Sequence, residues 1–190
     1  MGKFNFIETK INGIYIIEPK VFGDHRGYFM ETYNKNDFFE AGLTMEFVQD
    51  NESKSKKGVL RGLHFQTKHT QGKLVRVTQG QVFDVAVDLR KGSSTFGKWE
   101  GVILTDENKK QFYVPKGFAH GFLVMSDVAV FNYKCTDYYA PEYDSGVLWN
   151  DEDIAIEWPL AGIKEILLSD KDKIQKKLKD LEVPFEYKGA

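Results

Sequence analysis

The sequence predicts a mainly β protein, and three features of its composition and pattern indicate this class. Phe, Tyr and Trp number 15, 9 and 3, together 14% of the 190 residues, and aromatic side chains suit a pleated, half-buried sheet surface. The 17 Gly and 5 Pro punctuate short runs of apolar residues. These runs recur along most of the chain, and many short strands at regular spacing are typical of a sandwich or a barrel.

The expected strands follow one another along the chain, and turns containing Gly or Pro separate most of them. They cover residues 4–9, 13–18, 27–33, 59–66, 73–78, 81–89, 97–104, 111–114, 120–125 and 128–136. A helix is expected over 34–42, where Asn34 can cap the start and a glycine ends the run. A short capped helix is expected over 169–181, with its basic side chains forming a solvated face.

Length and charge indicate one domain, and the charge balance gives no electrostatic reason to expect a polyanion as its main partner. A single domain is expected over 1–190, with a core over about 13–136 and a C-terminal extension over about 150–190. Lys and Arg number 26 against 28 Asp and Glu, a formal net charge of −2, so neither nucleic acid nor a membrane surface is an expected partner. No apolar run suits a signal peptide or a membrane span, and Cys135 is the single cysteine. A cytoplasmic location is therefore expected.

Several expected strands place an ionisable side chain on an otherwise apolar face, because successive side chains of a strand point to opposite sides. These side chains are Lys73, Asp84, Asp88, His120 and Tyr133. Any one of them alone could be an edge residue that snorkels or makes a structural hydrogen bond. Together they predict a barrel with a partly polar lumen, which can enclose a ligand.

The run 59–66 carries a guanidinium, a glycine and an imidazole close together, at Arg61, Gly62 and His64. Strict alternation would put Arg61 and His64 on opposite faces. A bulge at Gly62 could turn both side chains inward, and the sequence leaves this alternative open.

A metal site is the first functional alternative. The run 115–120 resembles the second motif of cupin barrels, whose histidine, here His120, is often a metal ligand. The first cupin motif normally supplies two histidines one residue apart, and here His64 is followed by Gln66 in the second place. No metal is therefore expected. Nucleophilic catalysis by Cys135 is not expected either, since no histidine lies near it in a pairing motif.

Several motifs, in order over nearly the whole chain, resemble the dTDP-4-dehydrorhamnose 3,5-epimerase family. The matching stretches are 22–31, 49–51, 60–66, 71–77, 82–90, 114–122, 133–142 and 168–172. The resemblance implies a cupin-type jelly-roll β-barrel with short flanking helices. It implies an isomerase that epimerises C3 and C5 of dTDP-4-dehydro-6-deoxy-D-glucose, needs no cofactor and forms a homodimer.

The resemblance also implies roles for individual residues. His64 is the expected base. Asp172 is favoured as the carboxylate that orients it, and Asp170 remains the alternative. Tyr133 is the expected acid on the opposite face of the sugar, and Lys73 stabilises the oxygen of the C4 enolate. The residues expected to contact the nucleotide sugar are Gln49, Asn51, Arg61, His120, Tyr139, Asp144 and Lys171. Those expected to reach the neighbouring subunit's site are Arg26, Phe29 and Glu31.

These residue types suit proton transfer next to a ketone. Imidazole has a reference pKa of about 6.5, close to working pH, and a neighbouring carboxylate fixes its tautomer. A lysine on an apolar stripe is costly unless an anion such as an enolate meets it.

Three alternative functions remain: a single-site epimerase of a related nucleotide ketosugar, a non-catalytic barrel that binds sugar nucleotides, and a metal-dependent cupin oxygenase.

Overall fold

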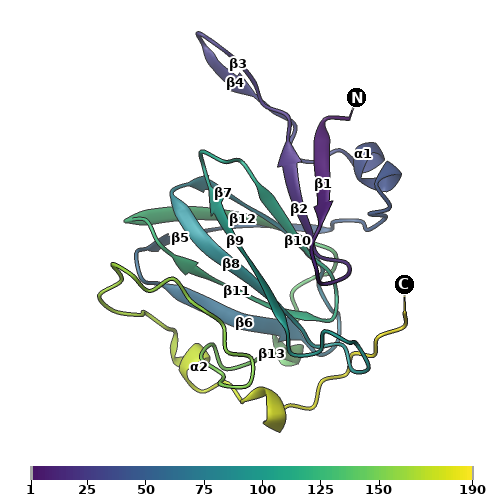
Figure 1. The fold of residues 1–190 in the computed structure, drawn as a ribbon, viewed down its shortest axis with the longest axis vertical. Coiled ribbons are helices and arrows are strands. Elements are labelled where there is room, and N and C mark those ends of the chain that lie inside the picture. The colour runs from purple at the N-terminus through teal and green to yellow at the C-terminus, as the bar shows by residue number, and fades with distance from the viewer. Residues whose placement is uncertain (1, 190) are drawn as a thin grey trace.

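Two antiparallel sheets face each other in the computed structural model, which describes residues 2–189 (Figure 1). The larger sheet consists, in spatial order, of β1 (Phe4–Glu8), β2 (Tyr15–Pro19), β10 (Gln111–Val114), β7 (Lys73–Gln79), β12 (Val128–Cys135) and β5 (Gln49–Lys56). The smaller sheet consists of β13 (Asp144–Gly146), β6 (Leu60–Gln66), β11 (Phe118–Val124), β8 (Gln81–Asp88) and β9 (Trp99–Thr105). The prediction of a mainly β, jelly-roll fold is confirmed.

A separate hairpin of β3 (Phe22–Asp24) and β4 (Gly27–Phe29) projects away from both sheets (Figure 1). The expected strand 27–33 therefore ends early, at Phe29. The chain then leaves the hairpin towards the helix α1 (Lys35–Glu40).

Strand β5 is absent from the expectations. Its sequence, QDNESKSK, has no apolar alternation, yet it pairs with β12 along its whole length. It lies at the edge of the larger sheet, where most of its side chains remain in contact with solvent. A strand that buries little apolar surface leaves no periodic signal in the sequence.

The core between the sheets contains the apolar side chains that share a strand face with the ionisable residues noted above. These are Val75, Val77, Val82, Ala86, Phe122, Val124, Ala129 and Phe131. The strand-face prediction is thus confirmed. Strand alternation directs the side chains of Lys73, Asp84, His120 and Tyr133 towards the space between the sheets.

The expected helix at 34–42 forms as α1, where the Asn34 side chain accepts hydrogen bonds from two backbone N–H groups and Phe38 is buried. The expected helix over 169–181 is wrong beyond its first turn. Ser169 caps α2 (Asp170–Lys173), which ends after four residues, and a one-turn 3-10 helix, η2 (Leu178–Asp180), follows. A parallel bridge between Val147 and Lys176 draws the intervening chain onto the body of the protein instead.

The C-terminal segment covers the outer face of the smaller sheet. Val183 is buried there, and Leu178, Leu181 and Phe185 pack on the same cluster, which includes Leu63 of β6. Tertiary packing of these apolar side chains, rather than helix propensity, fixes this segment. Over the described part of the chain, no helix has the length and apolar character to span a membrane.

Candidate active site

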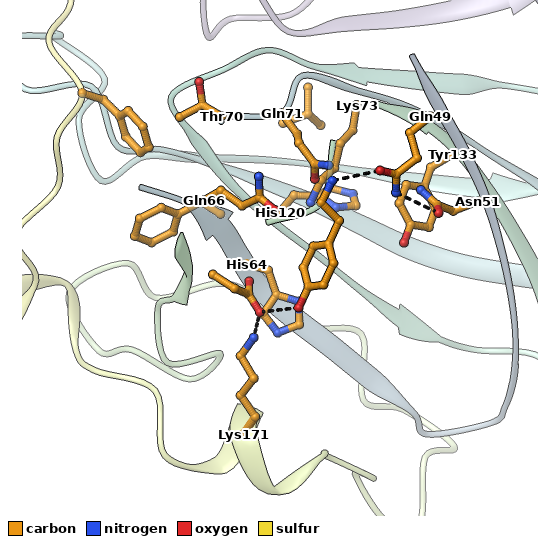
Figure 2. A pocket seen from close by; sticks show the side chains of 15 residues that line it. Gln49, Asn51, His64, Gln66, Thr70, Gln71, Lys73, His120, Tyr133 and Lys171 are labelled. Carbon is orange, nitrogen blue, oxygen red and sulfur yellow. Dashed lines mark hydrogen bonds and ion pairs between the residues drawn. The ribbon is translucent and has the colours of Figure 1, made fainter. Parts of the chain in front are cut away.

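A cavity of about 350 Å³ lies between the sheets and adjoins a smaller one of about 170 Å³. Figure 2 shows the side chains that line the larger cavity. Expected site residues that line it are Gln49, Asn51, His64, Lys73, His120, Tyr133, Tyr139, Asp144 and Lys171. Arg61 lines the smaller cavity together with His64, Lys73, His120 and Tyr133.

His64 enters the cavity from β6 and is hydrogen-bonded to Asp172 of α2. Its Nε2 lies 2.5 Å from Asp172 Oδ1, and Ser169 Oγ donates to Asp172 Oδ2 at 2.7 Å. Desolvation opposes ionisation of Asp172, but the hydrogen bonds from His64 and Ser169 outweigh it and hold the Asp172 pKa below its usual range. An ionised carboxylate only accepts, so Nε2 carries a proton, and in the neutral imidazole Nδ1 is then the nitrogen with the free lone pair. Asp170, by contrast, has a fully exposed side chain that pairs with Lys173 at 2.9 Å.

A bulge in β6 brings Arg61 and His64 to the same cavity. His64 pairs with His120 of β11, while Arg61 pairs with Phe122, so β6 holds one more residue than β11 in this interval. Gly62 stands at the bulge with a φ of 128°. A Cβ there would lie 2.6 Å from the Cα of Gly121, so only glycine allows the two strands to approach this closely.

Tyr133 and Lys73 come from the opposite sheet, on the neighbouring strands β12 and β7, where Cys135 is the register partner of Lys73. Burial raises the pKa of the Tyr133 phenol, which stays protonated at neutral pH. Burial lowers the pKa of the Lys73 ammonium, and the thiolate form of Cys135 and the Asp84 carboxylate would act against this change. Thus an imidazole faces the cavity from one sheet, and a phenol and an ammonium face it from the other.

His120 is held from behind by a second carboxylate. Its Nε2 lies 2.8 Å from Oδ1 of Asp84, which is 0% exposed. The ring of Phe131 stacks on that of Phe122 with centroids 4.1 Å apart, and both residues line the smaller cavity. Apolar walls of this kind limit the water that can surround a charge in the cavity.

One side of the cavity is closed by a chain of polar contacts. Tyr139 Oη donates to Asp144 Oδ2 at 3.3 Å, and Lys171 Nζ forms an ion pair with the same oxygen (Figure 2). The Tyr139 backbone N–H donates to Gln49 Oε1 at 2.9 Å, and Gln49 Nε2 donates to Asn51 Oδ1 at 3.0 Å. These contacts connect the loop after β12 to β5 and α2.

Comparison with known proteins agrees with this geometry. The family described as dTDP-4-dehydrorhamnose 3,5-epimerase matches residues 8–180. The chain belongs to this epimerase family. The dTDP-4-dehydrorhamnose 3,5-epimerase of Methanothermobacter thermautotrophicus is 58% identical over 180 residues, which is 95% of this chain and 97% of that protein. The one from Escherichia coli K12 is 56% identical over 171 residues, covering 89% and 91%.

A crystal structure agrees as well. The epimerase RmlC of Legionella pneumophila, solved in complex with dTDP-4-keto-L-rhamnose, has a TM-score of 0.94 and 53% identity, and the match covers 98% of this chain and 100% of that chain. The protein described here is accordingly an enzyme, a carbohydrate epimerase with the jelly-roll fold of that family.

Three of the expected binding residues of the epimerase lie away from the cavity of their own chain. Arg26 and Phe29 belong to the projecting hairpin, where Arg26 pairs with Asp24 at 2.6 Å and Phe29 is 65% exposed. Glu31 follows the hairpin and pairs with Lys3. A single chain therefore does not bring these three side chains to the site.

The cavity of the epimerase also has lining residues to which sequence reasoning gave no role. Gln66 holds two loops, because its Nε2 donates to His69 O at 2.6 Å and its Oε1 accepts from Ala140 N at 2.8 Å. Gln66 and Gln71 lie within the stretches that resemble the epimerase family, so the sequence motifs could have pointed to both. Phe185 reaches the cavity from the C-terminal segment, and no motif pointed to it. Within residues 2–189, no cluster of three or more His, Cys, Asp or Glu side chains forms a metal site.

Proposed function

We propose that the enzyme inverts C3 and C5 of dTDP-4-dehydro-6-deoxy-D-glucose, giving dTDP-4-dehydro-L-rhamnose, by removing and returning protons next to the C4 ketone. One observation carries the proposal: His64 enters the cavity from one sheet, while Tyr133 and Lys73 enter from the other. A sugar ring between the sheets then has a base on one face and an acid on the other. The ligand of the Legionella structure, dTDP-4-keto-L-rhamnose, supports the substrate class.

His64 removes the carbon-bound proton through Nδ1, because Nε2 is engaged with Asp172 at 2.5 Å. The ionised carboxylate fixes this tautomer and stabilises the imidazolium that forms. Asp172 is only 2% exposed, so its charge acts on the imidazole with little screening by water.

Lys73 stabilises the negative charge that collects on the C4 oxygen after proton removal. Its desolvation, which lowers its pKa, is costly in the resting enzyme. The enolate oxygen relieves that cost in the transition state, where a preorganised charge contributes most to the rate.

Tyr133 returns a proton to the opposite face of the ring. Burial holds its pKa above the usual range, so the proton is available throughout the neutral range and the side chain carries no charge beforehand. Inversion follows because the proton leaves on one face and arrives on the other.

The remaining polar side chains bind the nucleotide sugar. The Arg61 guanidinium, now held by Ser55 Oγ at 3.2 Å, can form a bidentate contact with a diphosphate. The other proposed contacts are Gln49, Asn51, His120, Tyr139, Asp144 and Lys171. No resident cofactor or metal enters this proposal.

The site is completed by a second copy of the chain in a homodimer, which we place in the cytoplasm. The projecting hairpin exposes Phe22, Tyr28 and Phe29, and it carries Arg26. Exposed aromatic side chains on a projecting segment favour an interface with another chain. In the dimer, Arg26, Phe29 and Glu31 reach the cavity of the neighbouring subunit.

Solvent exchange tests the reaction directly. Purified enzyme is mixed with the dTDP-ketosugar in heavy water, and deuterium at C3 and C5 is followed by NMR. We expect deuterium at both carbons. Deuterium at one carbon would indicate a single-site epimerase, and tight binding without exchange would indicate a non-catalytic sugar-nucleotide-binding protein.

A further inference from the structure

Asp84 is the most unusual buried group of the molecule. Its side chain is 0% exposed, and its Oδ1 lies 2.8 Å from His120 Nε2. Its Oδ2 is the one buried side-chain N or O atom of residues 2–189 that has no hydrogen-bond partner. Buried polar atoms are nearly always satisfied, so an exception calls for a physical reason.

Asp88 provides a comparison on the same strand. It lies on the same face of β8 and is equally buried. Its two oxygens accept from Arg90 Nε and Nη2 at 2.8 Å, and from Ser93 Oγ and Thr95 Oγ1 at 2.7 Å. The strand can therefore satisfy a buried carboxylate completely, and at Asp84 it leaves one oxygen free in the interior.

Asp84 interacts electrostatically with Lys73, which enters from the facing sheet: each group favours the charged form of the other. Figure 2 shows Lys73 and His120 directed into the same part of the cavity. The titratable and charged groups around Lys73 are Tyr133 and Cys135 of β12, Arg61 and His64 of β6, His120 of β11 and Asp84 of β8. Desolvation raises the pKa of both the Tyr133 phenol and the Cys135 thiol, so both are neutral at pH 7. Asp84 is the only carboxyl group of this set, and His120 and Lys73 favour its ionised form against the effect of burial.

We propose that Asp84 is a positioning residue of the epimerase, whose carboxylate keeps Lys73 in its ammonium form and orients His120 towards the sugar. This inference rests on the proposed role of Lys73 at the enolate oxygen. An ammonium in an apolar cavity loses its proton readily, and a neutral amine could not stabilise an enolate by charge. The unpaired oxygen of Asp84 supplies the opposing attraction without binding Lys73 so closely that the ammonium is withdrawn from the substrate.

The same carboxylate fixes the His120 ring. An ionised Asp84 can only accept, so His120 Nε2 carries a proton and Nδ1 is the nitrogen left for the substrate. Burial raises the pKa of the Asp84 carboxyl, while His120 and Lys73 act against that rise. Asp84, His120 and Lys73 therefore form one electrostatic unit, in which each group depends on the charge of the others.

The test compares Asp84→Asn with Asp88→Asn, the same substitution at an equally buried aspartate of the same strand. For Asp84→Asn we expect kcat to fall on the order of tenfold to a hundredfold, with a smaller change in KM. The alkaline limb of the kcat–pH profile should move down by roughly one pH unit, because Lys73 loses the attraction that opposes its deprotonation. Asp88→Asn should lower thermal stability and leave the limb in place, and Asp84→Glu should return the limb towards its original position.

A measurement on the unaltered enzyme keeps the inference testable if Asp84→Asn does not fold. In protein labelled with ¹⁵N-histidine, the His120 signals at pH 7 should show a protonated Nε2. An unprotonated Nε2 would mean that Asp84 holds the proton and carries no charge, which would overturn the inference. An alkaline limb that stays in place in folded Asp84→Asn would overturn it equally.

Lys73→Met separates this inference from the proposed function. If Lys73→Met retains full activity, the proposed role of Lys73 itself fails. If Lys73→Met is inactive while Asp84→Asn keeps the rate and pH profile of the unaltered enzyme, only the role of Asp84 fails.

Discussion

At the scale of single residues, burial is the main cause of the pKa shifts in the cavity. The same loss of water raises the pKa of Tyr133 and lowers that of Lys73, because desolvation always disfavours the charged form. Asp172 is the exception, since hydrogen bonds from His64 and Ser169 outweigh desolvation. The cavity thus holds a neutral phenol, an amino group whose charged form is disfavoured by burial, and an imidazole hydrogen-bonded to an ionised carboxylate.

His64→Ala tests the base. We expect deuterium exchange into the substrate to slow by about 10²–10⁴-fold, the usual contribution of general base catalysis, with little change in the unfolding transition. His69→Ala is the matched control, because the His69 side chain is 58% exposed and does not line the cavity. Near-normal exchange by folded His64→Ala would reject His64 as the base.

Acid stability depends on Asp88. Desolvation opposes its ionisation, but hydrogen bonds from Arg90, Ser93 and Thr95 hold its pKa below the usual range. Between that lowered pKa and the ordinary unfolded value of about 3.9, the unfolded chain binds more protons, so stability falls as the pH falls. We expect Asp88→Asn to be less stable at pH 7 and to lose less stability between about pH 5 and pH 3. Urea unfolding at each pH measures this, and parallel losses in both proteins would contradict it.

At the scale of elements, the bulge in β6 places two functional groups on one side of a strand. Regular alternation would have separated Arg61 from His64, and the extra residue at Gly62 removes that separation. The close approach of β6 to β11 at Gly121 keeps His64 opposite His120. The geometry of the site therefore depends on this backbone irregularity as well as on the side chains.

Gly62→Ala should displace β6 from β11. The new Cβ would meet Gly121 Cα at 2.6 Å and His120 O at 2.9 Å, and the positive φ adds about 1–3 kcal/mol of strain. We expect a clear loss of stability and a large loss of exchange activity. Gly92→Ala is the control, because it has a φ of 82° with nothing within 4 Å of the added Cβ, and it should cost only the backbone strain. Similar activity in the two variants would show that the close approach is unimportant for the site.

At the scale of the whole molecule, one chain forms the cavity but leaves the hairpin of β3 and β4 outside it (Figure 1). The hairpin packs on neither sheet, and its aromatic side chains remain exposed. A second chain that covers these exposed side chains would account for the hairpin, and the proposed homodimer supplies such a chain.

Complementation tests whether subunits share the site. His64→Ala and Arg26→Ala should each be inactive alone. In a mixed dimer, the subunit with an intact His64 receives the intact hairpin of its partner, so one site works. With random exchange of subunits, about a quarter of all sites should be active. The control mixes either single variant with protein that carries both His64→Ala and Arg26→Ala. It should restore no activity. Continued inactivity of the first mixture, with mixed dimers present, would contradict shared sites.

Much of the fold followed from periodicity, because strands that bury one face must alternate. The strands that form the core were predicted within a few residues, and so was the face that carries Lys73, Asp84, His120 and Tyr133. Strand β5 was missed because an edge strand with solvated side chains needs no apolar pattern. The predicted helix over 169–181 was too long, because its basic residues resemble a solvated helical face. In the structure, packing of Leu178 and Leu181 decides the path of the chain.

The sequence by itself determined the fold class, the family and the chemical types at the site, because each is recorded in local pattern or in motif order. Tertiary structure alone decided which of two neighbouring aspartates meets His64, that Arg61 and His64 face one cavity, and that Asp84 binds His120 through one oxygen while its other oxygen lies unpaired. These facts depend on contacts between segments far apart in the chain, such as β6 with α2, and on a local break in strand alternation. No local pattern specifies how two distant segments meet, so only the folded chain fixes the distances on which proton transfer depends.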